Sequence, residues 1–169
     1  PARVVLKTPA TTGILPCSFP TSASAACARP CITLPLFHAV VRGDVSLVSI
    51  GENTNIQDGC VLHGQNRQHD VRVGRDVTVG HQAIIHGSVV EDEVLIGMGA
   101  RVLNGCVVGA GSIVAAGAVL REGTRVPAKS LIAGVPAHVR REVKAEELEM
   151  IRKSARQYIE YARTHRQQS

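Results

Sequence analysis

The stretch Val90–Val114, VEDEVLIGMGARVLNGCVVGAGSIV, decides the fold, because an aliphatic residue returns at every sixth position. The same six-residue step links most of the chain, at Ile50, Ile56, Leu62, Val73, Val79, Ile85, Val90, Ile96, Val102, Val108, Val114, Leu120 and Val126. A strand repeats its faces every two residues and a helix about every 3.6, so neither element explains the pattern. A short fixed period carried over many repeats is typical of a solenoid.

The other positions of the repeat indicate its shape. Glycine commonly follows the aliphatic residue, as in IGEN, VGHQ and IGMG, and a small or β-branched residue comes four places after it. Aromatic residues make up only 2% of the chain and Trp is missing, so the interior must be narrow. Such hexapeptides resemble the left-handed parallel β-helix, a triangular prism with three repeats per coil. We therefore expect an all-β solenoid, followed by a C-terminal α-helix.

The pattern divides the chain into three segments. Residues 1–36 have no hexapeptide register and no acidic residue, and we expect an irregular, degenerate first coil; a sequence error or frame slip upstream of Phe37 is the alternative. Residues 37–130 form the predicted β-helix. In residues 131–169 we expect a linker and then a helix, because apolar residues follow helical spacing from about Val143 to Thr164. That helix would pack on the prism or on a neighbouring subunit.

Composition excludes several classes of function. The net charge of +5 is not accompanied by aromatic residues that could stack on bases, so we expect no nucleic-acid partner. No apolar run of about 18 residues predicts a membrane span. The five cysteines are odd in number and lack a regular disulfide spacing, which favours a reducing, cytoplasmic location. Cys60 and Cys106 fall at small positions of the repeat and are predicted to fill the core.

The repeat slips twice, and both slips lie beside histidines. Leu62 and Val73 are 11 residues apart rather than 12, and Ile85 and Val90 are five apart rather than six. The 18 residues from His63 to His81 are about one coil, so we expect these two on adjacent coils near one edge, with His86 around a corner. Three histidines can hold a catalytic zinc ion with an open position for water. Their directions are out of phase, so a symmetry-related chain would have to complete the set; surface histidines at bends are the alternative.

Two upstream strings add charged and amide groups. VVRGD contains Arg42 and Asp44, and NIQDG contains Gln57 and Asp58 shortly before His63. An Arg and two carboxylates suit charge-assisted pairing between packed faces, and the Gln57 amide could hold a metal-bound water. RGD also occurs as an adhesion motif, but here it leads into a hydrophobic repeat rather than into an exposed hairpin tip.

Taken together, VVRGD, NIQDG followed by VLHG, GHQAIIHG and IGMGA resemble the γ-class carbonic anhydrase family, and most closely its short bacterial and archaeal branch with the ferripyochelin-binding-like proteins. The resemblance runs from about Phe37 to the C-terminal helix. It implies a homotrimer with metal sites between subunits, in which His63 and His86 come from one chain and His81 from its neighbour.

The resemblance also implies roles for further residues. Arg42, Asp44 and Asp58 would form ion pairs at the trimer contact, and Gln57 would lie near the metal-bound solvent. Tyr158, in SARQYIEYA, resembles a helix tyrosine that reaches the site.

The implied activity is the reversible hydration of CO2 to bicarbonate by zinc-bound hydroxide, with Fe²⁺ or Co²⁺ as alternatives to Zn²⁺. The chain departs from the best-studied archaeal members, because its insert GQNRQHD is short and contains no glutamate to shuttle protons. His69 in this insert is a candidate shuttle, and a solvated loop histidine without a role is the alternative. Two other functions compete: a metal-dependent thioesterase or acyl-CoA hydrolase, and a non-catalytic trimeric assembly subunit.

Overall fold

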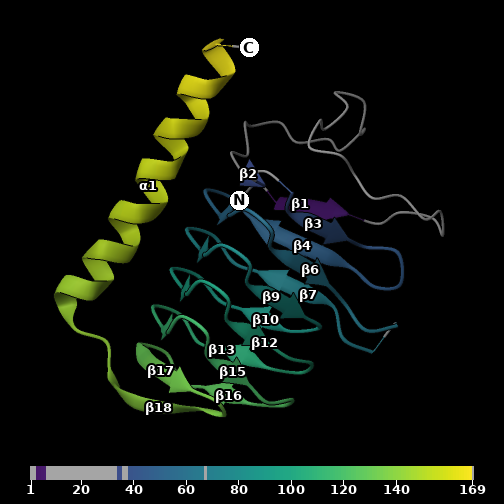
Figure 1. Cartoon of the computed structure of the whole chain (residues 1–169), viewed down its shortest axis with the longest axis vertical. Coiled ribbons are helices and arrows are strands. Elements are labelled where there is room, and N and C mark those ends of the chain that lie inside the picture. Colours follow the sequence, from purple (N-terminus) through teal and green to yellow (C-terminus); the bar gives the residue numbers. More distant parts are fainter. Residues whose placement is uncertain (1–2, 7–33, 36–37, 67, 169) are drawn as a thin grey trace.

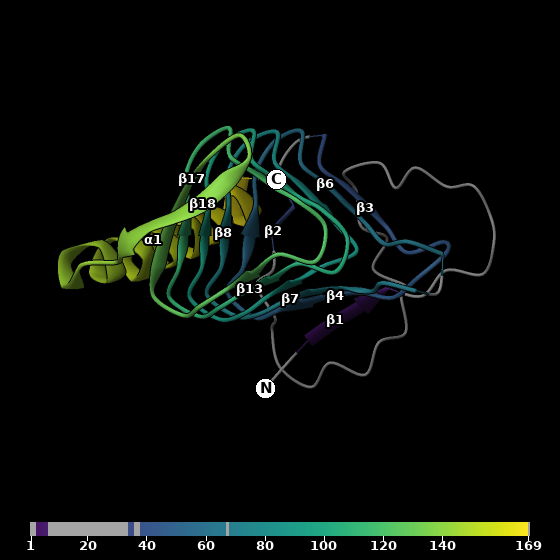
Figure 2. The same cartoon turned by 90° about the horizontal axis from the view of Figure 1, so that it is seen from below.

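The computed structural model describes residues 3–6, 34–35, 38–66 and 68–168. Over these residues the chain forms a parallel β-solenoid with one C-terminal helix running beside it (Figure 1). Viewed from below, the coils enclose a roughly triangular space, and the helix lies along one side (Figure 2). The predicted all-β solenoid with a C-terminal helix is therefore confirmed.

The coils contribute short strands to three sheets, which we call A, B and C. Within the described residues, sheet A contains β1 (Arg3–Leu6), β4 (Val48–Gly51), β7 (Val71–Val73), β10 (Val89–Val90), β13 (Val107–Val108) and β16 (Arg125–Val126). Sheet B contains β2 (Leu34–Pro35), β5 (Asn55–Ile56), β8 (Thr78–Val79), β11 (Leu95–Ile96), β14 (Ile113–Val114), β17 (Ser130–Gly134) and β18 (Ala137–Glu142). Sheet C contains β3 (Val40–Arg42), β6 (Val61–His63), β9 (Ile84–His86), β12 (Arg101–Val102) and β15 (Val119–Leu120).

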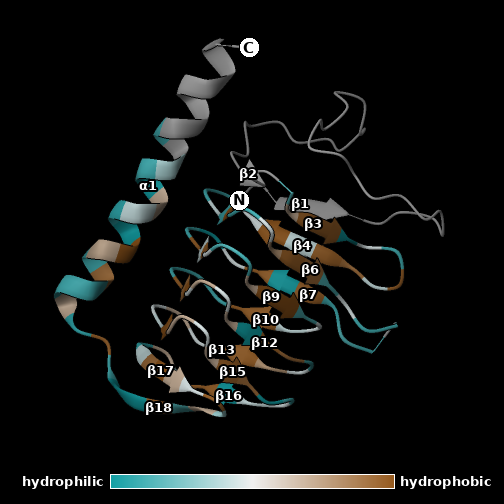
Figure 3. Cartoon of the chain, in the orientation of Figure 1, coloured by the Kyte–Doolittle hydropathy of each residue, from teal (hydrophilic) through white to brown (hydrophobic). Residues whose placement is uncertain are grey.

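Strand register explains why the aliphatic period of six builds a core. In parallel pairs, Val90 lies opposite Val73 and Val108, and Val102 lies opposite Ile85 and Leu120. All thirteen aliphatic positions of the repeat are at most 5% exposed and belong to one hydrophobic core. The strands of the solenoid are correspondingly hydrophobic (Figure 3). Each coil thus stacks its aliphatic side chains on those of the next coil along the axis of the solenoid.

Close stacking of the coils also explains the glycine that follows the aliphatic residue. A Cβ atom added at Gly97 would lie 2.4 Å from the backbone nitrogen of Ala116 in the next coil, closer than real Cβ atoms approach. Cys60 and Cys106 are fully buried among the aliphatic side chains, as predicted for small core fillers. Burial raises the pKa of the Cys60 thiol to about 11.

The insert between β6 and β7 lengthens one coil without shifting the register. His63 pairs with His86, 23 residues later, whereas Ile85 pairs with Val102. Gln65 and His69 close the insert on itself, because the backbone N–H of Gln65 donates to the His69 carbonyl at 3.0 Å. The extra residues therefore project as a loop at the corner between sheets C and A.

The end of the solenoid differs from the expectation. Residues 130–142 form β17 and β18 rather than a linker: β17 continues sheet B in parallel with β14, and β18 turns back antiparallel to β17. The helix α1 (Ala145–Gln168) follows. Near its start, Glu147 accepts two hydrogen bonds from Arg141, each of 2.7 Å.

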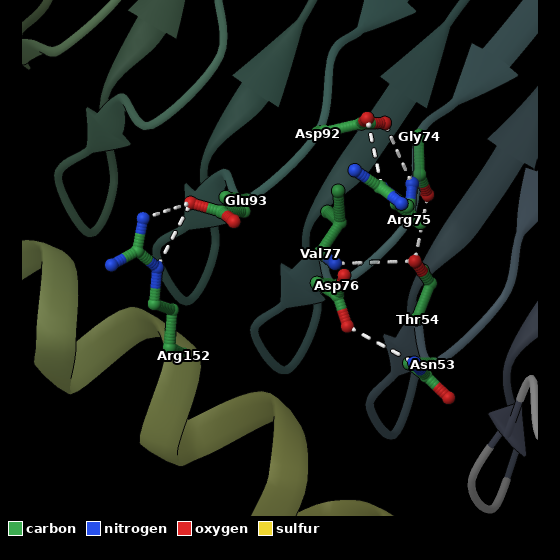
Figure 4. A network of polar contacts seen from close by, with 9 residues as sticks. All are labelled: Asn53, Thr54, Gly74, Arg75, Asp76, Val77, Asp92, Glu93 and Arg152. Carbon is green, nitrogen blue, oxygen red and sulfur yellow. Dashed lines mark hydrogen bonds and ion pairs between the residues drawn. The ribbon is translucent and has the colours of Figure 1, made fainter.

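Helix α1 packs against sheet B of its own chain. Its residues Ile151 and Leu148 form a second apolar cluster with Ile113 and Leu95. Arg152 adds an ion pair to Glu93 with an N–O distance of 3.0 Å (Figure 4). The helix thus covers one face of the prism, as Figure 2 shows.

Most of the predicted irregular segment 1–36 lies outside the described residues. Of its described parts, β1 pairs antiparallel with β4, and β2 pairs parallel with β5.

Candidate metal centre

His63 and His86 lie opposite each other on neighbouring strands of sheet C. Each directly follows a buried aliphatic residue, Leu62 or Ile85, so alternation along the strand turns both imidazole rings to the outer face. The Nδ1 atom of His63 is 3.2 Å from the Nε2 atom of His86. Parallel pairing of β6 and β9 therefore brings together two residues that are 23 positions apart.

The other nitrogen of each ring has a separate partner. The Nε2 atom of His63 is 3.0 Å from a carboxylate oxygen of Asp44, and the Nδ1 atom of His86 is 2.7 Å from the amide oxygen of Asn104. Both oxygens are acceptors, so each ring carries its proton on the nitrogen that faces outward from the pair. Partial desolvation raises the pKa of Asp44, but the hydrogen bond from His63 and the charge of Arg42 outweigh it and leave the pKa below its ordinary value.

This arrangement directs two lone pairs at one another, and it suits a divalent metal ion. Two imidazole nitrogens bound at 2.0–2.1 Å in tetrahedral geometry lie about 3.3 Å apart. The observed separation between His63 and His86 is 3.2 Å. Histidine ligands also typically donate their second N–H to a carboxylate or carbonyl, as these two do. The two residues therefore fit half of a metal site.

His81 does not join this pair within the chain. It lies in the turn after β8, at the corner between sheets B and C, where its Nδ1 atom is 3.3 Å from Asp58. The expectation that His63 and His81 share one edge and His86 lies around a corner is wrong. The insert makes the coil longer than 18 residues, so register pairs His63 with His86. Among the described residues, no group of three potential metal ligands forms.

His81 instead belongs to a buried polar network at the edge of sheet B. The backbone N–H of His81 donates to Gln57 at 3.2 Å, the Gln57 amide donates to Asn55 at 3.3 Å, and Asn55 donates to Thr78 at 2.9 Å. Asn55, Gln57 and Thr78 are each at most 5% exposed. The sequence analysis missed Asn55, although it lies two residues before Gln57 and therefore on the same face of the strand.

Asp58 has one satisfied oxygen and one unsatisfied oxygen. Its Oδ2 atom contacts His81, but its Oδ1 atom is buried and has no hydrogen-bond partner. Arg42 is half-exposed and reaches only Asp44, at 3.4 Å. Within one chain, the predicted ion-pair residues therefore form the pair Arg42–Asp44 and leave Asp58 open for a partner.

His69 lies next to the histidine pair, at the corner between sheets C and A. Gly87, the residue after His86, has a φ of +52°, and a Cβ there would lie 2.5 Å from the Asn104 oxygen and 2.8 Å from the His69 Cβ. Glycine is thus required for Asn104 and His69 to approach the strand. A cavity of about 370 Å³ beside them is lined in part by His69, Gly105 and Arg125.

Tyr158 lies on α1 and is half-buried. The helix contacts β5 and β8, so Tyr158 belongs to the sheet B side of the molecule, which also carries Gln57. It does not share a face with the histidine pair of sheet C.

Comparison with known proteins agrees with these motifs. Residues 87–122 match the family described as bacterial transferase hexapeptide (six repeats). The chain is 41% identical to gamma carbonic anhydrase 1, mitochondrial, of Arabidopsis thaliana, over 76% of this chain and 49% of that protein. It is also 41% identical to a protein named probable carbonic anhydrase of Methanocaldococcus jannaschii, over 76% of this chain and 80% of that protein. The chain thus spans about half the length of the plant relative.

A solved structure of similar fold is that of a hexapeptide transferase family protein from Anaplasma phagocytophilum. It superposes with a TM-score of 0.72 at 38% sequence identity, covering 76% of this chain and 75% of that one. In the part of the chain that the structure describes, the helix is neither long nor apolar enough to cross a membrane.

Proposed function

Because the chain belongs to the γ-carbonic anhydrase-like family of hexapeptide-repeat proteins, we propose that it is a metal-dependent carbonic anhydrase, acting on CO2 and bicarbonate at sites between subunits. The observation that carries the proposal is the convergence of His63 Nδ1 and His86 Nε2 at 3.2 Å. Asp44 and Asn104 occupy the other two ring nitrogens, so the facing lone pairs have no acceptor role left except toward a cation or a proton.

The metal ligands would be His63 and His86 of one chain and His81 of a neighbouring chain. Zinc is the first candidate, with Fe²⁺ or Co²⁺ as alternatives. When bound, such an ion lowers the pKa of a coordinated water toward about 7 and so supplies the nucleophile for CO2 at neutral pH. Asp44 orients His63 through its Nε2–H, and its carboxylate increases the basicity of the ring as a ligand.

A homotrimer would complete the site. The histidine pair lies toward the sheet A end of sheet C, and His81 lies at the sheet B end, so a head-to-tail ring of three chains brings each pair against a neighbour's His81. Sheet C offers an outer row of half-buried apolar residues, Val40, Val61 and Ile84, and in the described part of the chain the helix covers sheet B instead.

Ion pairs would fix the contact between chains. The buried, unsatisfied Oδ1 atom of Asp58 requires a donor, and Arg42 of a neighbouring copy can provide it while still holding Asp44. An unsatisfied buried carboxylate oxygen costs about 1–3 kcal/mol, so such a donor would stabilise the assembly.

Three further residues have proposed roles in substrate handling. Gln57 would arrive at the site with His81, since the two are hydrogen-bonded in one chain. Its oxygen retains a second lone pair, which can orient solvent at the site. Tyr158 would approach from the same neighbouring chain, on α1. His69, beside Gly87, would carry a proton from the site toward solvent, because an ordinary histidine titrates near neutral pH.

Cytoplasmic localisation remains a proposal, supported by the buried free thiols of Cys60 and Cys106.

Stopped-flow measurement of CO2 hydration, on zinc-loaded and metal-stripped protein, tests the proposal. We expect activity only in the loaded protein. Equal activity in both preparations, or none in either, would contradict it. A parallel acyl-CoA hydrolysis assay separates the alternatives: hydrolysis without CO2 hydration would identify a hydrolase, and zinc-bound trimers inactive in both assays would identify an assembly subunit.

A further inference from the structure

We propose that Asn104 is a positioning residue, and that Glu122 orients it so that His86 keeps its Nε2 lone pair directed at His63. This inference rests on the proposed metal site. It adds two residues that touch neither metal nor substrate and that none of the quoted sequence motifs indicates.

The three residues form a hydrogen-bonded column along the corner between sheets C and A. His86 and Asn104 are 18 residues apart, and so are Asn104 and Glu122, which places them on successive coils. The Asn104 oxygen is 2.7 Å from His86 Nδ1, and the Asn104 nitrogen is 2.9 Å from a carboxylate oxygen of Glu122. The stacking of the coils therefore links the surface residue Glu122 to the histidine pair.

The chemistry of each group fixes the direction of the next. An ionised carboxylate only accepts hydrogen bonds, so Glu122 must face the NH2 end of the Asn104 amide. The oxygen end then faces His86. Because this oxygen also only accepts, His86 must carry its proton on Nδ1, which leaves Nε2 unprotonated in the neutral ring.

The two histidines are thus held by different devices. Asp44 has two equivalent oxygens and selects the His63 tautomer by itself. The amide of Asn104 has two different ends, and rotation by 180° would present an NH2 donor to His86 and select the opposite tautomer. Glu122 is the group that prevents this rotation.

A similar contact elsewhere in the chain provides a matched control. Asn53 donates from its amide nitrogen to Asp76 at 3.2 Å, also between neighbouring coils, and no histidine contacts its oxygen (Figure 4). Replacing Asn53 therefore removes an amide–carboxylate contact of the same kind without affecting the histidine pair.

The test measures two properties of the full-length protein for N104A, N104D, E122A, E122Q and N53A. The first is the ¹⁵N chemical shifts of the His86 ring without metal, at about pH 8.5, roughly two units above the ordinary histidine pKa. The second is zinc affinity by competition with a chelator. We expect N104A to yield mixed tautomers and to weaken zinc binding about ten- to a hundredfold.

The remaining variants distinguish positioning from general stability. N104D keeps an acceptor for His86 Nδ1 and should retain the tautomer, and E122Q keeps an acceptor for the Asn104 amide. E122A should produce a partial tautomer mixture and a smaller loss of affinity than N104A. N53A should change neither property.

The outcomes separate this inference from the proposed function. It is overturned if N104A leaves the His86 shifts and zinc affinity as they are in N53A. If wild-type protein binds no zinc but the His86 tautomer still depends on Asn104 and Glu122, the positioning role holds and the metal site is refuted.

Discussion

His63 and His86 lie directly opposite each other on strands β6 and β9, with their facing ring nitrogens 3.2 Å apart. Their separation is set by the pairing of two strands rather than by a flexible loop. The half-site is therefore formed by the fold itself before any metal or neighbouring chain is present. A rigid solenoid supplies this preorganisation, because every coil is held by the coils on both sides.

Replacing Asp44 by Asn tests how His63 is oriented. The D44N variant loses the charged acceptor at 3.0 Å, and its amide can turn a donor toward the ring. We expect zinc affinity, measured by chelator competition, to fall about ten- to a hundredfold. The control is D92N, whose carboxylate accepts from Arg75 at the opposite end of sheet A (Figure 4). If D44N and D92N bind zinc equally well, Asp44 does not orient a ligand.

Alanine at Gly87 should disturb the site, whereas alanine at Gly117 should not. Both glycines have positive φ, at +52° and +67°, so both variants should lose about 1–2 kcal/mol of unfolding free energy from backbone strain. Only at Gly87 would the new Cβ approach Asn104 and His69; at Gly117 the space is open. Urea unfolding and zinc titration of the two variants separate these effects. An unchanged zinc affinity in G87A would refute the tight approach of Asn104.

Removal of the His69 imidazole should slow proton transfer specifically. In H69A we expect a lower kcat in dilute buffer, recovery when imidazole is added, and an unchanged kcat/KM for CO2, because hydration precedes the transfer of the proton to solvent. H138A, at an exposed histidine of β18, is the control. A kcat that does not depend on buffer concentration in H69A would exclude this role.

The ion pair at the start of α1 predicts an acid-dependent contribution to stability. Hydrogen bonds from the Arg141 side chain and the Lys144 backbone lower the pKa of Glu147 from 4.5 to about 2. A folded-state pKa below the unfolded value stabilises the protein above the unfolded pKa, and this contribution disappears as the pH falls from about 4.5 toward about 2.

E147Q removes this titration. We expect the Tm difference between metal-free wild type and E147Q to be largest near neutral pH and to shrink below about pH 4.5, and high salt should reduce it because the pair is exposed. A Tm difference that stays constant from neutral pH to about pH 3 would contradict the assigned pKa.

The six-residue period was sufficient to predict the solenoid, because each aliphatic position that it marks points into a core with no other way to be filled. It also placed Cys60 and Cys106 correctly. It could not predict β17 and β18, since Pro127 ends the repeat while the backbone continues sheet B for one more strand pair. Pairing there depends on the exposed hydrogen-bonding edge of β14 rather than on a side-chain pattern.

The site was less accessible from sequence. Counting residues from His63 placed His81 beside it, but strand register is set by stacking, and the looped insert absorbs the extra residues. Asn104 was missed because LNG is typical of an ordinary turn. The signal that could have revealed it is the repeated spacing of 18 residues from His86 to Asn104 and on to Glu122.

The most direct test of a metal site shared between chains is the zinc content of mixed trimers that combine H81A and H86A subunits, purified through two different affinity tags. Each variant alone should form trimers with little zinc. In every mixed trimer, one interface joins His63 and His86 of an H81A chain to His81 of an H86A chain. We predict that this single site binds zinc with wild-type affinity. Mixed trimers as poor in zinc as their parents, or H81A trimers that keep full zinc occupancy, would contradict the account.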